Sequence, residues 1–181
     1  MPQERLKALD LKNKRALVID ENVHTRKLLI DLLKSFDFGE VSIAPSTTDA
    51  LAMLQAVKFD FVFCNWTQAP LDSAAFALRV RALEEPGLRE IPIFVMKPAA
   101  KVSDVVTARD AGVTEFLTVP VSANALLQVF ESALVRKRKF VEAENFRGPD
   151  RRRRRDETAP VERRKTDRED KTDPKDPKWE V

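Results

Sequence analysis

Five short apolar runs alternate with segments of helical periodicity between residues 16 and 140 of this 181-residue chain. The run ALVID is apolar throughout and ends in an acid, which is typical of a strand buried on both faces. Strands that alternate with helices in this way predict a five-stranded, doubly wound parallel sheet. The predicted strands span 16–20, 41–45, 59–65, 91–97 and 115–120, and the predicted helices span 22–36, 47–57, 73–83, 103–112 and 122–140.

The residues that end the predicted strands are the first candidates for a functional site, because ligands of parallel sheets bind beyond the carboxyl ends of the strands. Asp20 and Glu21 follow the first strand, and Asn65 ends the third. Lys97 ends the fourth strand and Val119 lies at the end of the fifth. We expect these side chains to lie at one edge of the sheet.

The composition changes after about residue 145. Residues 136–181 hold 17 Lys and Arg against 12 Asp and Glu, and the last part has very few apolar side chains. Such a segment cannot bury enough surface to offset the entropy lost on ordering. We therefore divide the chain into a polar N-terminal extension at 1–12, a folded domain at 13–140 and a disordered, basic and mixed-charge tail at 141–181.

Cysteine content and hydropathy bear on where the protein works. The single cysteine, Cys64, excludes an internal disulfide and suits a reducing compartment. In a core strand this thiol is expected to be inert packing. The sequence contains no apolar run of roughly 18 residues, so no membrane-spanning helix and no membrane partner are expected. We predict a cytoplasmic protein.

Four segments occur in a characteristic order: the acidic pair at 20–21, DFVFCNWTQAPLD at 60–72, IPIFVM at 91–96 and AGVTEFLTVPV at 111–121. With the final amphipathic helix, they resemble the receiver domain of bacterial two-component response regulators over roughly residues 13–138. The resemblance implies the flavodoxin-like receiver fold and a role in two-component signalling or a phosphorelay.

The resemblance also implies a phosphoacceptor site, which this chain has altered. Asp20 and Glu21 match the acidic pair that holds Mg²⁺ in the family, but the position of the phosphate-accepting aspartate is Asn65. A carboxamide oxygen is a poor nucleophile, and its neutrality removes one negative charge from a metal site. We therefore expect no phosphorylation, no enzyme activity, no catalytic residues and no cofactor, with Mg²⁺ bound only weakly at Asp20 and Glu21, if at all.

The family's switch positions are altered too. Lys97 stands where a Thr or Ser closes onto the phosphate, and Phe116 matches the aromatic that turns inward. Val119, which precedes Pro120, replaces a lysine that pairs with the phosphate; in the family the bond before this proline is cis. Lys97 is predicted either to form an internal ion pair with the acidic pair or to be a solvated loop residue.

Arginines dominate the start of the predicted tail. Five in succession supply many planar donors for phosphates or carboxylates. The segment is predicted to bind an acidic protein, a nucleic acid or cyclic di-GMP, or to be a solvated, charge-balanced tail. The candidate polyanion-binding residues are Arg147, Arg151, Arg152, Arg153, Arg154 and Arg155.

The predicted function is that of a non-catalytic, phosphorylation-independent signalling adaptor. Its partner would be a histidine kinase, another regulator, or a motility or cell-cycle component. The expected contact and homodimer surface combines the helix at 103–112, the strand at 115–120 and the helix at 122–140, with Val105, Val106, Arg109, Phe116 and Leu117.

Two alternative functions remain open. One is a polyanion effector that acts through the arginines. Another is a phosphoacceptor that uses Asp60 or Asp72 instead of Asn65. Trp66 is expected either to contact a partner, as exposed aromatic side chains often do, or to pack in its own loop.

Overall fold

The computed structural model describes residues 9–66 and 72–151. It contains a five-stranded parallel sheet with the order β2-β1-β3-β4-β5, which confirms the predicted fold class. The strands are β1 (Arg15–Ile19), β2 (Glu40–Ala44), β3 (Phe61–Asn65), β4 (Ile93–Lys97) and β5 (Glu115–Thr118). The helices are η1 (Leu11–Asn13), α2 (Val23–Ser35), α3 (Thr47–Ala56), α4 (Ser73–Arg81), α5 (Pro86–Arg89), α6 (Val102–Asp110) and α7 (Ala123–Leu134).

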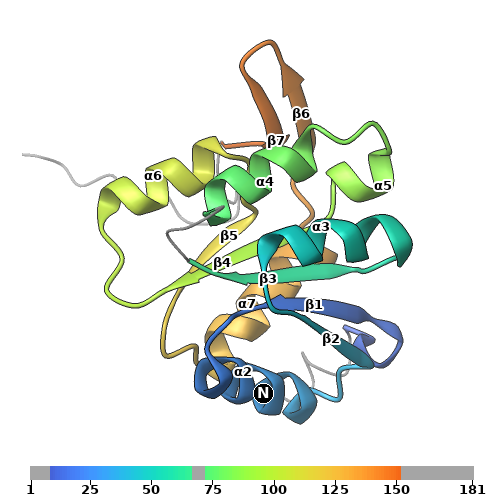
Figure 1. Ribbon diagram of the computed structural model, residues 1–181, viewed down its shortest axis with the longest axis vertical. Coiled ribbons are helices and arrows are strands. Elements are labelled where there is room, and N and C mark those ends of the chain that lie inside the picture. Colours follow the sequence, from blue (N-terminus) through green and yellow to red (C-terminus); the bar gives the residue numbers. More distant parts are fainter. Residues whose placement is uncertain (1–8, 67–71, 152–181) are drawn as a thin grey trace, which may run out of the picture. The chain divides into compact units, whose positions relative to one another are not determined.

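The helices cover both faces of the sheet, as Figure 1 shows, and each face has its own apolar core. Helices α2 and α7 cover one face, where four phenylalanine rings lie 5.1 to 6.2 Å apart between neighbouring centroids. Helices α3, α4 and α6 cover the other face. The central strands alternate between the two cores, which explains their unbroken apolar sequence. The four rings are those of Phe61, Phe63, Phe94 and Phe130.

Side-chain caps fix where several helices begin. Asn22 Oδ1 accepts the N–H groups of His24 and Thr25 at the start of α2. Ser46 caps α3, and Ser122 caps α7. These caps satisfy N–H groups that have no partner within the helix, and they hold each strand-to-helix loop in one conformation.

The C-terminal boundary of the folded domain differs from the prediction. Helix α7 ends at Leu134 rather than at residue 140, because the N–H groups of Val135 and Arg136 both turn back to the Glu131 carbonyl. The chain then forms an antiparallel hairpin of β6 (Phe140–Ala143) and β7 (Phe146–Pro149). The prediction of disorder from residue 141 is therefore wrong for residues 141–149, whereas residues 152–181 lie outside the described residues.

Packing against the domain explains why this weakly apolar hairpin is ordered. Gly148 lies against Gly112, and a Cβ added at Gly148 would come within 2.6 Å of the Gly112 Cα. The Phe140 ring lies 5.7 Å from the guanidinium carbon of Arg81. Arg81 is fully buried and donates to the carbonyl oxygens of Gly112, Arg89 and Ile91. Burial lowers the pKa of Arg81 to about 9, so the guanidinium remains cationic at neutral pH.

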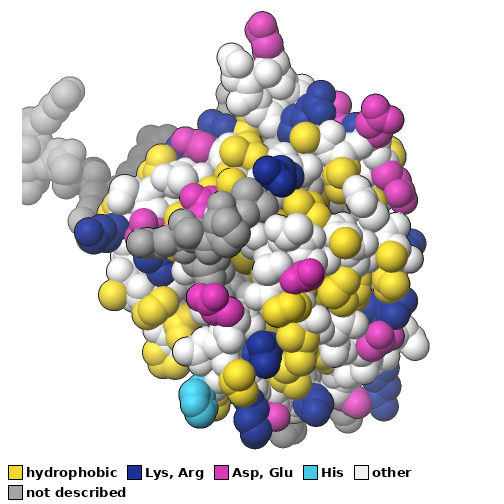
Figure 2. Space-filling view, viewed as in Figure 1, with side chains coloured by type: hydrophobic (Ala, Val, Ile, Leu, Met, Phe, Trp, Pro, Cys, Tyr) yellow, Lys and Arg dark blue, Asp and Glu magenta, His cyan; other side chains and the backbone are white. Residues whose placement is uncertain are grey.

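Within residues 9–66 and 72–151, no helix is both long enough and apolar enough to cross a membrane. Side chains of both charge signs are interspersed on the face seen in Figure 2, with hydrophobic side chains between them.

Candidate functional site

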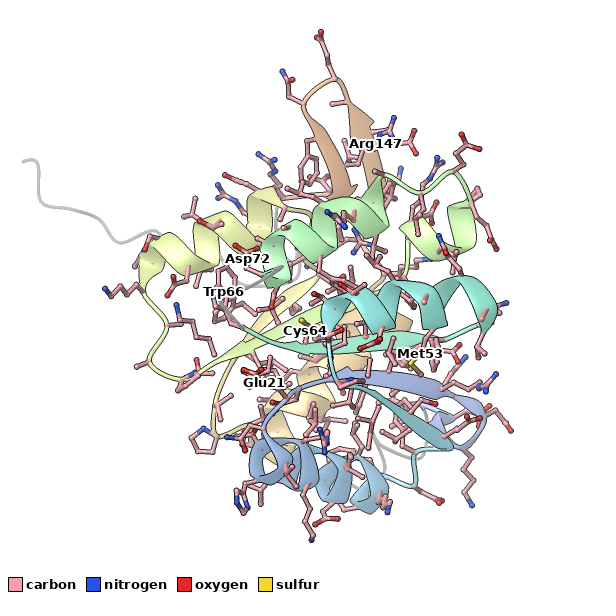
Figure 3. The ribbon with its side chains drawn as sticks, viewed as in Figure 1. Glu21, Met53, Cys64, Trp66, Asp72 and Arg147 are labelled. Carbon is pink, nitrogen blue, oxygen red and sulfur yellow. The ribbon has the colours of Figure 1, made fainter. Side chains whose placement is uncertain are left out.

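The strand ends meet at one edge of the sheet, as the sequence predicts. The register pairs Ile19 with Cys64, Asn65 with Met96, and Lys97 with Thr118, so the residues that follow these strands are neighbours. Figure 3 shows Glu21 and Trp66 at this edge, away from Arg147 on the hairpin.

Asp20 is the centre of the site. Its carboxylate is 2% exposed and accepts three hydrogen bonds. They come from Asn65 Nδ2 at 3.1 Å, the Thr25 hydroxyl at 2.5 Å and the Asn22 N–H at 2.9 Å. Because Asn65 donates, the carboxamide supplies an attractive partner where a carboxylate would repel. Asn22 and Thr25 therefore belong to the site; the helix-cap pattern that follows the acidic pair was the sequence signal for them.

Lys97 has a different partner from the one predicted. Its ammonium lies 2.8 Å from the Asp104 carboxylate and 5.2 Å from the centroid of the Trp66 ring. The predicted ion pair with Asp20 and Glu21 is therefore wrong, because Asp104 in the first turn of α6 presents a nearer carboxylate. The hydrogen bond from Lys97 lowers the pKa of Asp104 below its usual value, aided by the N–H of Lys101.

Two aromatic rings continue this arrangement toward β5. The half-buried Trp66 and Phe116 have centroids 6.0 Å apart with their planes tilted by 49°. The indole thus lies close to both the Phe116 ring and the Lys97 ammonium, and these contacts join Trp66 to β4 and β5. The Trp66 ring thus packs against side chains of β4 and β5. Its contact with a partner stays a prediction, and residues 67–71 of its loop lie outside the described residues.

The peptide bond between Val119 and Pro120 is cis. Together with Val121, these residues form the loop between β5 and α7 and line a pocket that also includes Asp20 and Asn65. The Val119 side chain thus forms part of the apolar wall of this pocket.

The comparison with protein families matches residues 16–131 to the response regulator receiver domain. This chain belongs to that family. It is 27% identical over 131 residues to chemotaxis protein CheY-3 of Vibrio cholerae, covering 72% of this chain and 99% of that protein.

Solved structures show the same fold. A crystal structure of chemotaxis protein CheY4 from Vibrio cholerae has a TM-score of 0.60 at 21% identity, covering 67% of this chain and 98% of that one. The receiver domain of sensor histidine kinase PA1611 from Pseudomonas aeruginosa has a TM-score of 0.60 at 18% identity, covering 68% and 98% of the chains. That structure has a magnesium ion coordinated in its active site cleft.

The residues of this receiver fit such an ion poorly. Mg²⁺ requires oxygen ligands close to octahedral geometry. Here three hydrogen-bond donors point at Asp20, and Glu21 is exposed. Among the residues that the structure describes, no group of three His, Cys, Asp or Glu side chains is placed to hold a metal.

The two alternative acceptor carboxylates have other roles in this receiver. Asp60 lies at the opposite edge of the sheet, where it accepts the Arg15 N–H and pairs with Lys14. Asp72 caps α4 by accepting the N–H of Ala75 at 2.7 Å.

Cys64 and His24 carry no chemistry that the site uses. Burial raises the pKa of the Cys64 thiol to about 12, and the sulfur lies 3.1 Å from the Ser73 hydroxyl. A thiol in this environment stays protonated and is inert. His24 is exposed in the first turn of α2.

The arginine candidates are described only in part. Arg147 is exposed on β7. Arg151 pairs with Asp110 at 3.4 Å, and its guanidinium carbon lies 3.8 Å from the centroid of the Phe146 ring. The positions 152–155 lie outside the described residues.

Proposed function

We propose that this receiver is a non-catalytic, phosphorylation-independent module that acts by binding a signalling protein. The single observation that carries the proposal is the hydrogen bond from Asn65 Nδ2 to Asp20. It joins the acceptor position to the acidic pair through a neutral donor. On this proposal, the site keeps this arrangement by its own contacts.

The contacts of Lys97 support a constant conformation as well. The Lys97–Asp104 ion pair connects the end of β4 to the first turn of α6, and the Trp66 and Phe116 rings pack beside it. Side chains with partners on neighbouring elements restrict movement between those elements. The face that includes α6 is proposed to keep one arrangement whatever the phosphorylation state of its pathway.

The proposed contact surface lies on α6, β5 and α7. Val105 and Val106 are 43% and 39% exposed, and Val102 at the start of α6 is 82% exposed. Leu117 differs from the prediction, because it is only 6% exposed and packs in the core beneath α7. Exposed valines on one helix suit an apolar anchor for a protein partner. A histidine kinase, another regulator and a motility or cell-cycle component are the proposed classes of partner.

Phosphorylation independence is tested with acetyl phosphate and Mg²⁺. We expect intact-mass spectrometry to detect no phosphoryl adduct, and we expect partner affinity to be unchanged when beryllofluoride is added. CheY-3 of Vibrio cholerae, treated in parallel, controls for reagent activity. A stable adduct on this chain, or a partner affinity that changes with beryllofluoride, would contradict the proposal.

The contact surface is tested with charge substitutions. Val105→Asp is expected to weaken partner capture, because a charge in an apolar contact must be desolvated. Val23→Asp, at a 60% exposed valine on α2, is the matched control and should leave capture unchanged. Any truncation of the tail should follow Arg151, since residues 140–149 are part of the folded domain. If Val105→Asp and Val23→Asp weaken partner capture equally, the contact surface cannot be assigned to α6.

The alternative function is capture of a polyanion, cyclic di-GMP or nucleic acid, by the arginines. Arg151 supports it weakly, because this guanidinium already pairs with Asp110 and lies over Phe146. Binding that disappears when residues 152–181 are removed, and that falls steeply with salt, would favour this function.

A further inference from the structure

A pocket of about 440 Å³ lies between α2 and the loop that joins β5 to α7. Its walls are mainly apolar side chains from both sides. Its polar lining is Asp20, Thr25 and Asn65 at the candidate site, with Asp31 and Ser35 on α2. The Asp31 carboxylate already pairs with Lys27 at 2.8 Å. The volume lies in the range of about 300–1,000 Å³ that is common for small-molecule sites. The wall residues used below are Leu28, Leu29, Leu32, Met96, Val119 and Val121.

The charge of Asp20 is balanced only by neutral donors. The carboxylate is 2% exposed, and its three partners are an amide, a hydroxyl and a main-chain N–H. Among the described residues, no lysine or arginine forms an ion pair with this carboxylate. Arg26 donates to the main-chain carbonyl of Asp20 instead. A buried anion in this condition is stabilised by any cation that reaches it with hydrogen-bond donors.

The walls determine what kind of cation fits. A hydrated metal ion would leave the apolar side chains of α2 and the β5–α7 loop unused. An apolar body would instead remove surface from water, including part of Leu28, which is 69% exposed. Apolar walls with a few polar groups at one end are typical of sites for small organic ligands.

We propose that this pocket binds a small organic ammonium compound, with the ammonium group at Asp20 and an apolar body against α2 and the β5–α7 loop. The ammonium donates to the Asp20 carboxylate, and Asn65 and Thr25 orient that carboxylate. This ligand site is separate from the α6 surface proposed for the protein partner, and it does not depend on that function.

A matched ligand series tests the proposal. The probes are 4-phenylbutylamine, 4-phenylbutanol and 4-phenylbutyrate, which share an apolar body and differ in the head group. Methyl and amide NMR titrations of the full chain give the dissociation constants. The amine is expected to bind at least about tenfold more tightly than the alcohol, because its hydrogen bond to the carboxylate is charge-assisted. Shifts should appear at the methyl groups of Leu28, Leu32 and Val121.

Three variants separate binding in the pocket from a general attraction of cations to the protein. Asp20→Asn should remove the preference for the amine over the alcohol. Val119→Lys keeps Asp20 and places a tethered ammonium in the same pocket, so it should abolish amine binding. Val23→Lys adds the same charge on α2 outside the pocket and should leave binding intact.

Three results would overturn the proposal. They are equal affinity for amine and alcohol, amine shifts that persist in Val119→Lys, and equal loss in Val119→Lys and Val23→Lys. If Asp20→Asn does not fold, the pair of lysine variants still decides the question, because neither removes the buried hydrogen bonds of the site. The partner-capture assay uses the α6 variants and is independent of these outcomes.

Discussion

Replacing Asn65 with aspartate tests the central contact of the site. Asn65 Nδ2 lies 3.1 Å from an Asp20 oxygen, and Asp20 is 2% exposed. The substitution Asn65→Asp keeps the shape of the side chain and changes the donor to an anionic oxygen. A favourable hydrogen bond thereby becomes a repulsion between two carboxylates.

The magnitude follows from this distance. Two unit charges 3.1 Å apart repel by about 5 kcal/mol at an effective dielectric constant of about 20. If the side chains separate to about 5 Å, the repulsion falls to about 3 kcal/mol. We therefore expect Asn65→Asp to lower the free energy of unfolding by about 3–5 kcal/mol at neutral pH without Mg²⁺. That is a large share of the roughly 5–15 kcal/mol of a typical domain.

The loss should depend on pH and on Mg²⁺. The repulsion raises the pKa of the new carboxyl in the folded state above its unfolded value. Stability is then retained below the unfolded pKa and lost as the pH rises through the folded pKa. A divalent cation between the carboxylates should restore stability, because it binds the folded state.

Urea denaturation with EDTA or with Mg²⁺ measures these effects. Asn13→Asp is the matched control, because Asn13 Nδ2 also donates to a carboxylate, that of Asp10, at 3.3 Å on the exposed surface. Because this site is exposed, screening by solvent and salt should limit the loss of unfolding free energy in Asn13→Asp to less than about 1 kcal/mol. The reasoning is refuted if Asn65→Asp is no more destabilising than Asn13→Asp, or if Mg²⁺ does not restore it.

Other contacts give further predictions. Lys97→Met removes the ion pair with Asp104 and should lower the free energy of unfolding. In a chain that ends at residue 151, which lacks Trp179, the substitution should also change Trp66 emission. Gly148→Ala places a Cβ 2.6 Å from another backbone and should destabilise the hairpin by about 1–3 kcal/mol, seen as faster amide exchange in β6 and β7. Gly87→Ala, whose nearest atom would be 3.7 Å away, is its control and should be neutral. Burial raises the pKa of the Cys64 thiol from 9.0 to about 12. The protonated thiol therefore contributes its full stabilisation of the folded state below pH 9.0, and this contribution is lost as the pH rises toward 12. Unfolding curves measured across this pH range test the prediction.

The candidate site shows where prediction from sequence reached its limit. Its members at the strand ends were predictable, because parallel strands bring their carboxyl ends to one edge. The partner of Lys97 was not predictable from the sequence. The flexible lysine side chain had three candidate carboxylates, those of Asp20, Glu21 and Asp104. The position and direction of α6 decided for Asp104.

The hairpin shows the same limit in the fold. Residues 140–149 contain two phenylalanines and one valine among charged residues, too little to indicate strands. They are ordered because they contact residues that are distant in sequence. Gly148 packs against Gly112, and the Phe140 ring lies beside the Arg81 guanidinium. Glu142 forms an ion pair with Arg89.

The sequence by itself determined the parallel sheet, the helix starts and the altered residues at the strand ends. Those features depend on apolar periodicity and on capping contacts between residues two or three positions apart. Only the tertiary structure decided the hydrogen bond from Asn65 to Asp20, the Lys97–Asp104 ion pair and the order of the hairpin. These depend on how separate strands and helices pack against one another, which no local pattern in the sequence sets.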